Sequence, residues 1–114
     1  FDIIAPYHNA KLTVDLYHSW WEPDLKEFFK KHSKKIVLLQ ICNLRVDNGV
    51  VIGRDIISEG ELNLPSVVPS LLRNKFTGRV ELELFERDLR GRNPLDIIKR
   101  LPLDFDALVV KNSE

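Results

Sequence analysis

The chain has 114 residues, 44% of them hydrophobic, with 17 acidic and 17 basic side chains and a formal net charge of zero. This length suits one domain with a hydrophobic core. Because charges are balanced and no long block of one sign occurs, composition gives no support to a nucleic-acid or membrane surface. Cys42 is the single cysteine, which excludes a disulfide framework and a cysteine zinc cluster and fits a reducing, cytoplasmic location.

From its start, we expect this chain to be something other than a complete translation product. It begins at Phe1 and contains no methionine, so we expect a processed or truncated chain, or part of a longer one. No apolar stretch of this sequence reaches the length of a membrane span, and we expect no signal peptide within it.

The first half of the chain alternates strand and helix patterns. Leu12–Leu16 reads as a strand, and Glu22-Pro23-Asp24 then predicts a helix start with proline in the first turn. The apolar face of that helix is Leu25, Phe28 and Phe29, followed at helical spacing by His32. Ile36–Cys42 is almost continuously apolar, which is typical of a parallel strand buried on both faces.

The second half continues the alternation after a hairpin signal. Asn48-Gly49 lies between β-branched residues and predicts a tight turn between two strands. Asn63 is a candidate cap for a helix whose apolar residues are Leu64, Val67, Val68, Leu71 and Leu72. Arg79–Phe85 alternates as a third strand. Asn93-Pro94 predicts the start of a third helix, which we expect to end at Pro102.

This order of strands and helices predicts βα units and a parallel sheet. Three strands leave both edges of such a sheet open, so the pattern indicates part of a larger α/β fold.

Polar residues fall near the ends of the predicted strands. Asp15 and His18 lie at the C-terminal end of the first, Gln40 lies late in the second, and Glu81 and Glu83 share one face of the third. In parallel α/β barrels the active site lies at the carboxyl ends of the strands. Carboxylate and amide oxygens there would suit Mg²⁺ or Mn²⁺, although polar strand ends also occur as simple caps.

Four segments carry a family resemblance: LTVDLYH, IVLLQIC, RDIISEGELNLPSVVPSLL and FTGRVELELF. Together they resemble the last three βα units of the xylose-isomerase-like TIM barrels. This family includes sugar phosphate isomerases and epimerases, hydroxypyruvate isomerases and the AP endonuclease family 2, or endonuclease IV, type. The resemblance spans Ala10 to Leu108. It implies that residues 1–114 are the C-terminal portion of a (β/α)8 barrel, about strands 6 to 8.

The resemblance implies a role for each strand-end residue. Asp15 matches a metal ligand and His18 a residue beside the substrate. Gln40 stands at or near the place of a metal-binding histidine, where similar family members use a glutamine oxygen. Glu83 matches a metal ligand that also acts as acid and base. Arg54 matches an arginine that contacts substrate.

The spacing before Arg54 departs from the family pattern. More residues than usual separate Gln40 from Arg54, and the excess is roughly the length of the Asn48-Gly49 hairpin. Arg45 is therefore an alternative candidate for the substrate-binding role. A guanidinium in either position could grip a carboxylate or phosphate by two hydrogen bonds.

The implied function is a divalent-metal-dependent isomerase or epimerase, with Mg²⁺ or Mn²⁺ preferred to Zn²⁺. The small-molecule substrate would be a sugar, sugar phosphate or hydroxy-carbonyl acid that reacts through an enediolate. The family also needs a glutamate on the fifth strand, which would precede Phe1, so we expect the N-terminal barrel half in the same or another chain.

Two alternatives remain open at this point. One is an endonuclease IV-like phosphodiesterase or another hydrolase on the same barrel. The three histidines and the neutral charge disfavour nucleic acid as a partner. The other is a non-catalytic barrel that binds a ligand or partner, because fold alone does not fix function.

Overall fold

The computed structural model describes residue 3 and residues 5–110. The strands are β1 (Leu12–Asp15), β2 (Ile36–Ile41), β3 (Asn43–Asp47), β4 (Val50–Asp55) and β5 (Arg79–Leu82). The helices are η1 (Leu16–His18), α1 (Leu25–His32), α2 (Leu64–Leu72), α3 (Glu86–Leu89) and α4 (Pro94–Val110). In this part of the chain no helix is long and apolar enough to cross a membrane.

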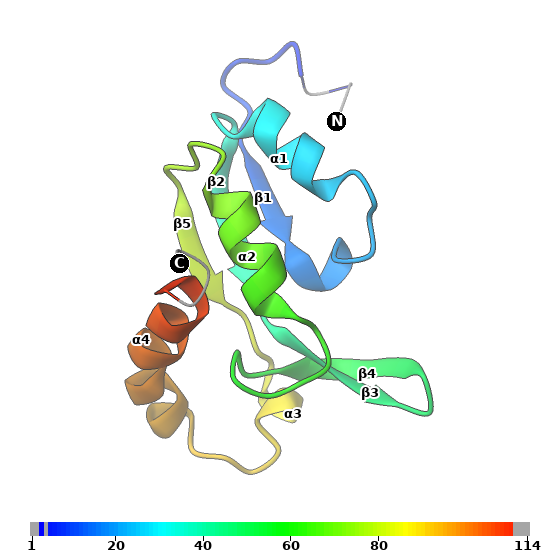
Figure 1. The fold of residues 1–114 in the computed structure, drawn as a ribbon, viewed down its shortest axis with the longest axis vertical. Coiled ribbons are helices and arrows are strands. Elements are labelled where there is room, and N and C mark those ends of the chain that lie inside the picture. The colour runs from blue at the N-terminus through cyan, green and yellow to red at the C-terminus, as the bar shows by residue number, and fades with distance from the viewer. Residues whose placement is uncertain (1–2, 4, 111–114) are drawn as a thin grey trace.

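A parallel sheet with the strand order β1-β2-β5 forms the centre of the molecule (Figure 1). The register aligns Asp15 of β1 with Gln40 of β2, and Gln40 with Glu81 of β5. Side chains at aligned positions of parallel strands point to the same face, so the three polar residues form a row across the sheet. The sequence prediction of a parallel sheet built from βα units is confirmed.

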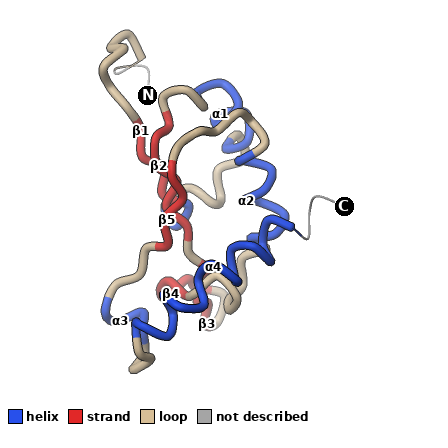
Figure 2. Tube along the Cα trace, turned by 90° about the vertical axis from the view of Figure 1, so that its left-hand side faces the viewer, coloured by secondary structure: helices blue, strands red, loops and turns tan. Residues whose placement is uncertain are grey.

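The hydrophobic core lies on one side of this sheet. Helices α1 and α2 lie on that side, whereas the other side has no helix layer over it in the described residues (Figure 2). Val14, Leu39 and Ile41 from the sheet pack with Phe29 of α1 and Val68 of α2. Since side chains alternate along a strand, the row that contains Asp15 and Gln40 faces the uncovered side.

The prediction that β2 is buried on both faces is wrong for the described chain. Leu38 and Gln40 are only partly buried, and Val37 is 44% exposed. The near-continuous apolar run reflects a strand that one layer of helices covers on one face only.

The β3–β4 hairpin extends from the carboxyl end of β2 (Figure 1). Its turn residues Asn48 and Gly49 both have positive φ, 49° and 75°. That pair of conformations matches the tight turn favoured between antiparallel strands. The predicted hairpin is therefore confirmed.

Helix α4 continues through Pro102 to Val110, so the predicted end at Pro102 is wrong. A proline inside a helix costs about 3 kcal/mol because it removes one hydrogen bond and crowds the preceding turn. Leu101, Phe105 and Leu108 follow at helical spacing and pack on the core, with Leu108 only 3% exposed. Full burial of a side chain such as Leu108 contributes about 1.5–3 kcal/mol, and the partial burial of Leu101 and Phe105 adds to it, which offsets the cost of proline.

The starts of the helices agree only in part with the sequence predictions. Helix α1 begins at Leu25, so Pro23 lies before it and not in its first turn. Helix α2 starts at Leu64 as predicted, but the Asn63 side chain forms no capping hydrogen bond. Asn93 does cap α4, because its Oδ1 accepts a hydrogen bond from the Leu95 N–H at 2.9 Å.

Both outer strands end earlier than predicted. Strand β1 stops at Asp15 because Leu16 enters the short helix η1. After β5 ends at Leu82, the Glu83 N–H still donates to the Ile41 carbonyl at 3.0 Å. The chain then turns away, because the Phe85 N–H donates to the side chain of Asp88 in the unpredicted helix α3.

Candidate functional site

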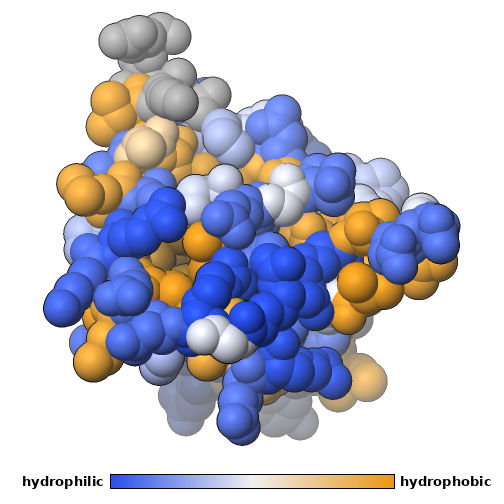
Figure 3. Space-filling model, turned by 90° about the horizontal axis from the view of Figure 1, so that it is seen from below, coloured by the Kyte–Doolittle hydropathy of each residue, from blue (hydrophilic) through white to orange (hydrophobic). Residues whose placement is uncertain are grey.

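The candidate site lies where the three parallel strands end, beside the β3–β4 hairpin. Figure 3 looks onto this end of the molecule and shows hydrophilic side chains gathered across its middle. Three charged residues meet here. Asp15 belongs to β1, Arg54 belongs to β4, and Glu83 directly follows β5. Segments far apart in the sequence thus contribute to one charged cluster.

Asp15 is held by the turn that follows it. Its Oδ1 accepts a hydrogen bond from the Tyr17 N–H at 2.9 Å, and its carbonyl accepts one from the Ser19 hydroxyl at 2.7 Å. These bonds tie the end of β1 to η1 and fix the direction of the carboxylate. Asp15 therefore presents a preorganised anion toward the uncovered side of the sheet.

The Arg54 guanidinium bridges the two carboxylates. Its Nη1 and Nη2 donate to the two oxygens of Asp15 at 3.3 and 3.0 Å. The same Nη2 lies 3.5 Å from Glu83 Oε2. Arg54 is only 4% exposed. A carboxylate from β1 and one from the residue after β5 thus share one buried cation.

Aromatic rings enclose this guanidinium. The ring centroids of Tyr17 and Phe85 lie 4.2 and 5.2 Å from its central carbon, within the range of cation–π contacts. Burial lowers the pKa of Arg54, but the hydrogen bond and charge of Asp15 outweigh that effect, so its pKa is raised above the ordinary value. Arg54 is a permanent cation in this site.

Gln40 lies between the two acidic strands. Its Nε2 donates to Glu81 Oε1 at 3.0 Å. This bond uses the amide nitrogen, whereas the amide oxygen is the atom that could bind a cation. Glu81 therefore holds the amide nitrogen of Gln40.

His18 lies at the rim. Its Nε2 is 3.8 Å from Asp15 Oδ2, and its side chain is 68% exposed. Trp20 and Trp21, which are 36% and 55% exposed, pack edge to face beside this segment. An exposed imidazole next to the carboxylate is placed to reach a bound molecule.

Cys42 contributes no negative charge to the site. Burial raises the pKa of its thiol to about 11, so it is a neutral thiol near pH 7. Its Sγ accepts a weak hydrogen bond from Arg54 Nη1 at 3.7 Å. Cys42 is thus a small buried residue of the site's interior.

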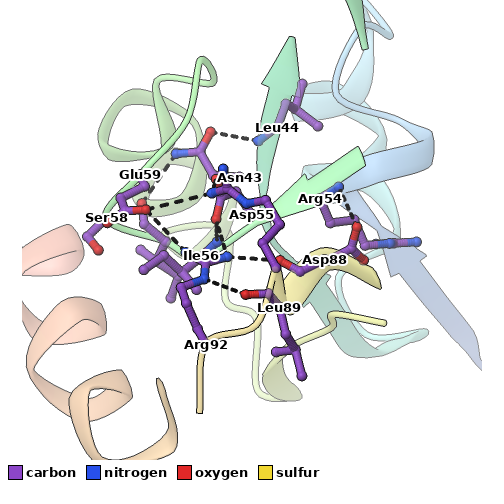
Figure 4. Close-up of polar contacts among 12 residues, drawn as sticks. Asn43, Leu44, Arg54, Asp55, Ile56, Ser58, Glu59, Asp88, Leu89 and Arg92 are labelled. Atoms are coloured by element: carbon purple, nitrogen blue, oxygen red, sulfur yellow. Dashed lines mark hydrogen bonds and ion pairs between the residues drawn. The ribbon is translucent and has the colours of Figure 1, made fainter. Parts of the chain in front are cut away.

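Asp88 supports the site from behind (Figure 4). It is fully buried, with 0% exposure. Its Oδ1 accepts from the Arg54 N–H at 3.2 Å and its Oδ2 from the Phe85 N–H at 2.9 Å. One carboxylate thereby connects β4 to the segment that carries Glu83. Nothing in the local sequence pattern around Asp88 predicted this role.

A second ionic cluster fixes the base of the hairpin. Asp55, which is nearly buried, accepts from Arg90 Nη2 at 2.7 Å and from Arg92 Nη2 at 2.8 Å. Arg92 also donates to the carbonyls of Asp88 and Leu89 (Figure 4). These bonds join β4 to α3 and to the loop that follows it.

Arg45, the alternative candidate to Arg54, lies away from the strand-end carboxylates. A side chain at Gly53 would collide with Arg45 Nη2 at 2.8 Å and with Asp88 Oδ1 at 3.1 Å. Arg45 is therefore on the Asp88 side of the hairpin, away from the guanidinium contacts with Asp15. The structure brings Arg54, and not Arg45, to the strand-end carboxylates.

A cavity of 480 Å³ opens beside the site along the free side of β1. Asp15 and His18 line it together with residues of β1, of α1 and of the loop between them: Thr13, Val14, Ser19, Glu22, Asp24, Leu25 and Phe28. Among the described residues, β1 pairs with β2 alone, so this cavity follows an unpaired sheet edge.

The oxygen atoms of the site are of the kind that a divalent cation prefers, but too few of them are present among the described residues. Asp15 and Glu83 reach the same cationic nitrogen, and Gln40 could add a neutral oxygen, as hard cations prefer. However, residue 3 and residues 5–110 contain no group of three or more His, Cys, Asp or Glu side chains placed to hold a metal ion. A further ligand would have to come from outside the described residues.

Parallel strands followed by helices, with polar residues at the strand ends, define successive βα units of a TIM barrel. Two solved structures resemble this chain in fold. The protein SMc04130 from Sinorhizobium meliloti 1021 matches 94% of this chain with a TM-score of 0.77 and 23% identity. The IolI protein, solved with a binding zinc atom, matches 90% with a TM-score of 0.69 and 21% identity.

The comparisons confirm the predicted fold class: the chain is an α/β fold that matches part of a TIM barrel. It spans 41% and 38% of the lengths of those two solved chains. No family model and no curated protein sequence matches it. At these identities the likeness shows the fold, and the roles of the site residues stay predictions.

Proposed function

We propose that this chain supplies the C-terminal part of a divalent-metal-dependent isomerase or epimerase. The observation that carries the proposal is the convergence of Asp15 and Glu83 on one nitrogen of Arg54 at the carboxyl ends of parallel strands. TIM-barrel enzymes bind their substrates at this end of the strands. A site that already places two carboxylates around a cation is suited to binding a metal ion.

The proposed ligands are Asp15, Gln40 and Glu83. A bound metal ion supplies Lewis-acid polarisation of neighbouring substrate oxygens. The all-oxygen set favours Mg²⁺ or Mn²⁺. Zinc is the alternative, because the IolI protein was solved with that metal.

Glu83 is the proposed acid and base. In an isomerase its carboxylate would take a proton from the carbon beside the substrate carbonyl and return it to the neighbouring carbon. In an epimerase the glutamate expected from the missing barrel half would return the proton on the opposite face. His18 and Arg54 would bind the substrate at the rim and floor of the site. The substrate class is a small sugar, a sugar phosphate or a hydroxy-carbonyl acid, which reacts through an enediolate.

The proposal requires more strands than this chain provides. In the described part, β1 and β5 each pair with one strand only, and the cavity beside β1 borders the first of these edges. Helix α4 also exposes Leu95, Ile98 and Leu103, which are 59%, 61% and 73% accessible. We propose that an N-terminal barrel half, from the same or another chain, covers these surfaces and adds a carboxylate ligand.

A non-catalytic barrel is the alternative function, and one observation favours it. Arg54 already neutralises Asp15 and lies beside Glu83, so the site is electrostatically satisfied without a metal ion. In that case the strand ends would bind a ligand or partner without chemistry.

Substitution of Asp15 by alanine tests the metal site. In protein made from the complete coding sequence, Asp15→Ala should lower divalent-metal affinity by about 100-fold, since a ligand is lost outright whereas loss of a supporting residue alone costs roughly 10–100-fold. Calorimetric titration with Mn²⁺ and metal analysis of the purified protein measure this. The matched control is Asp47→Ala, an exposed carboxylate near the hairpin tip. Equal metal content in Asp15→Ala and wild type would overturn the assignment.

A further inference from the structure

We propose that a cationic pocket at the amino-terminal end of the sheet binds a compact anion that carries two or more phosphate groups. The pocket is a cavity of 560 Å³ between the end of α1 and the end of α2. Six of the residues that line it are basic: Lys30, Lys31, Lys34, Lys35, Arg73 and Lys75. It lies at the opposite end of the sheet from the strand-end carboxylates, so this inference does not depend on the proposed function.

The fold brings together two basic segments that are far apart in the sequence. Residues 30–35 form the end of α1 and the turn before β2. Residues 73–75 directly follow α2. Both helices end near the start of β2, away from the β3–β4 hairpin (Figure 1). Lysines at a single helix end are common because they balance the helix dipole, but here two such ends meet around one cavity.

Neighbouring carboxylates do not balance the positive charge of this pocket. No Asp or Glu is among the described residues that line it. Glu27 lies one turn before Lys30 and Lys31 and lines an adjacent cavity with them. Within the described part of the chain, however, no lysine forms an ion pair with a carboxylate. The two helix ends contribute roughly half a negative charge each, so several positive charges remain in excess.

Lys35 is a positioned donor of this pocket. Its side chain is partly buried, and its Nζ donates to the Tyr7 carbonyl at 2.9 Å and to the Ala10 carbonyl at 3.5 Å. Carbonyl oxygens fix the position of the ammonium group without cancelling its charge. Because a lysine ammonium group has three N–H donors, one remains available to a bound anion.

The confined shape of the pocket favours a compact polyanion over a nucleic acid. A protein that binds DNA or RNA usually presents a basic stripe along the backbone of its ligand, whereas these six basic residues surround one cavity of a chain whose net charge is zero. Lysine binds phosphate as a point charge, so several ammonium groups around one cavity suit an anion with several charges, such as pyrophosphate or triphosphate. A bound anion would also join the ends of α1 and α2 and stabilise the folded chain.

Calorimetric titration with inorganic triphosphate tests the pocket in protein made from the complete coding sequence. The wild type is compared with two double variants, Lys31→Gln with Lys34→Gln and Lys26→Gln with Lys99→Gln. All four lysines are exposed, but Lys26 and Lys99 do not line the pocket. The first double variant should bind triphosphate about tenfold more weakly or worse, because charge-assisted hydrogen bonds are lost. The second should stay within about twofold of wild type, because salt screens distant exposed charges.

Three results would overturn the inference: no binding of triphosphate by the wild type, equal triphosphate affinities in the two double variants, or binding of sulfate or of a single-stranded oligonucleotide at least as tight as that of triphosphate. The pocket variants leave Asp15 and Glu83 unchanged, so their Mn²⁺ affinity should equal that of wild type. Failure of this inference is therefore distinguishable from failure of the proposed function.

Discussion

Replacement of Glu83 by glutamine should lower kcat by about 10²- to 10⁴-fold, the range that general acid–base catalysis contributes. Glutamine preserves the shape of the side chain but cannot take up and return a proton. Glu83 follows β5, is 29% exposed, and lies beside Asp15 and the Arg54 guanidinium. Its carboxylate is thus accessible to a substrate and close to the proposed metal position.

Deuterium exchange measures the loss of proton transfer in Glu83→Gln over a whole class of candidate substrates. The proton beside the carbonyl is followed by NMR in heavy water, over a panel of sugars, sugar phosphates and hydroxy-carbonyl acids. Metal is supplied in excess, so that weaker metal binding by Glu83→Gln does not limit turnover. Glu86→Gln, an exposed glutamate in α3, is the matched control and should keep wild-type exchange rates. Comparable rates in Glu83→Gln and Glu86→Gln would contradict the assigned role.

Replacement of Asp88 by alanine should lower the free energy of unfolding by about 3 kcal/mol or more. Asp88 is fully buried, and its two oxygens accept hydrogen bonds from the N–H groups of Arg54 and Phe85. Each buried donor left without a partner costs about 1–3 kcal/mol. The variant also leaves a cavity where the carboxylate was.

Urea denaturation of the complete protein measures the loss. Asp106→Ala, an exposed aspartate of α4, is the control and should change stability by no more than about 0.5 kcal/mol. Asp88→Asn keeps one acceptor oxygen and should fall between the two. A loss below about 1 kcal/mol for Asp88→Ala would show that the hairpin and α3 are held together by other contacts.

The strands and the hairpin could be predicted because their signals are local. Ile36–Ile41 is apolar except for Gln40, and Asn48-Gly49 adopts the positive φ angles that the turn requires. The continuation of α4 past Pro102 was missed because burial of Phe105 and Leu108 depends on contacts with other elements. Local propensity does not include that burial energy.

The candidate site was predicted in part. The strand-end positions of Asp15, Gln40 and Glu83 followed from the strand pattern and the family resemblance, and the sheet register places Asp15 level with Gln40. The pairing of Arg54 with Asp15 spans 39 positions in the sequence. No periodicity of the intervening residues indicates which arginine of the hairpin turns toward β1.

The supporting residues could not be predicted for a similar reason. Asp88 reads as an ordinary acidic residue of a short charged helix, and its role appears only when β4 packs against that helix. The same holds for Asp55 with Arg90 and Arg92, which are 35 and 37 positions away. Long-range ion pairs depend on the assembled fold, whereas helix and strand patterns are visible within a short window.

Anomalous diffraction from crystals of the complete protein grown with Mn²⁺ tests the central claim most directly. The account predicts one manganese peak within coordination distance of Asp15, of the Gln40 amide oxygen and of Glu83. At saturating Mn²⁺, the absence of a manganese peak between these residues would contradict it.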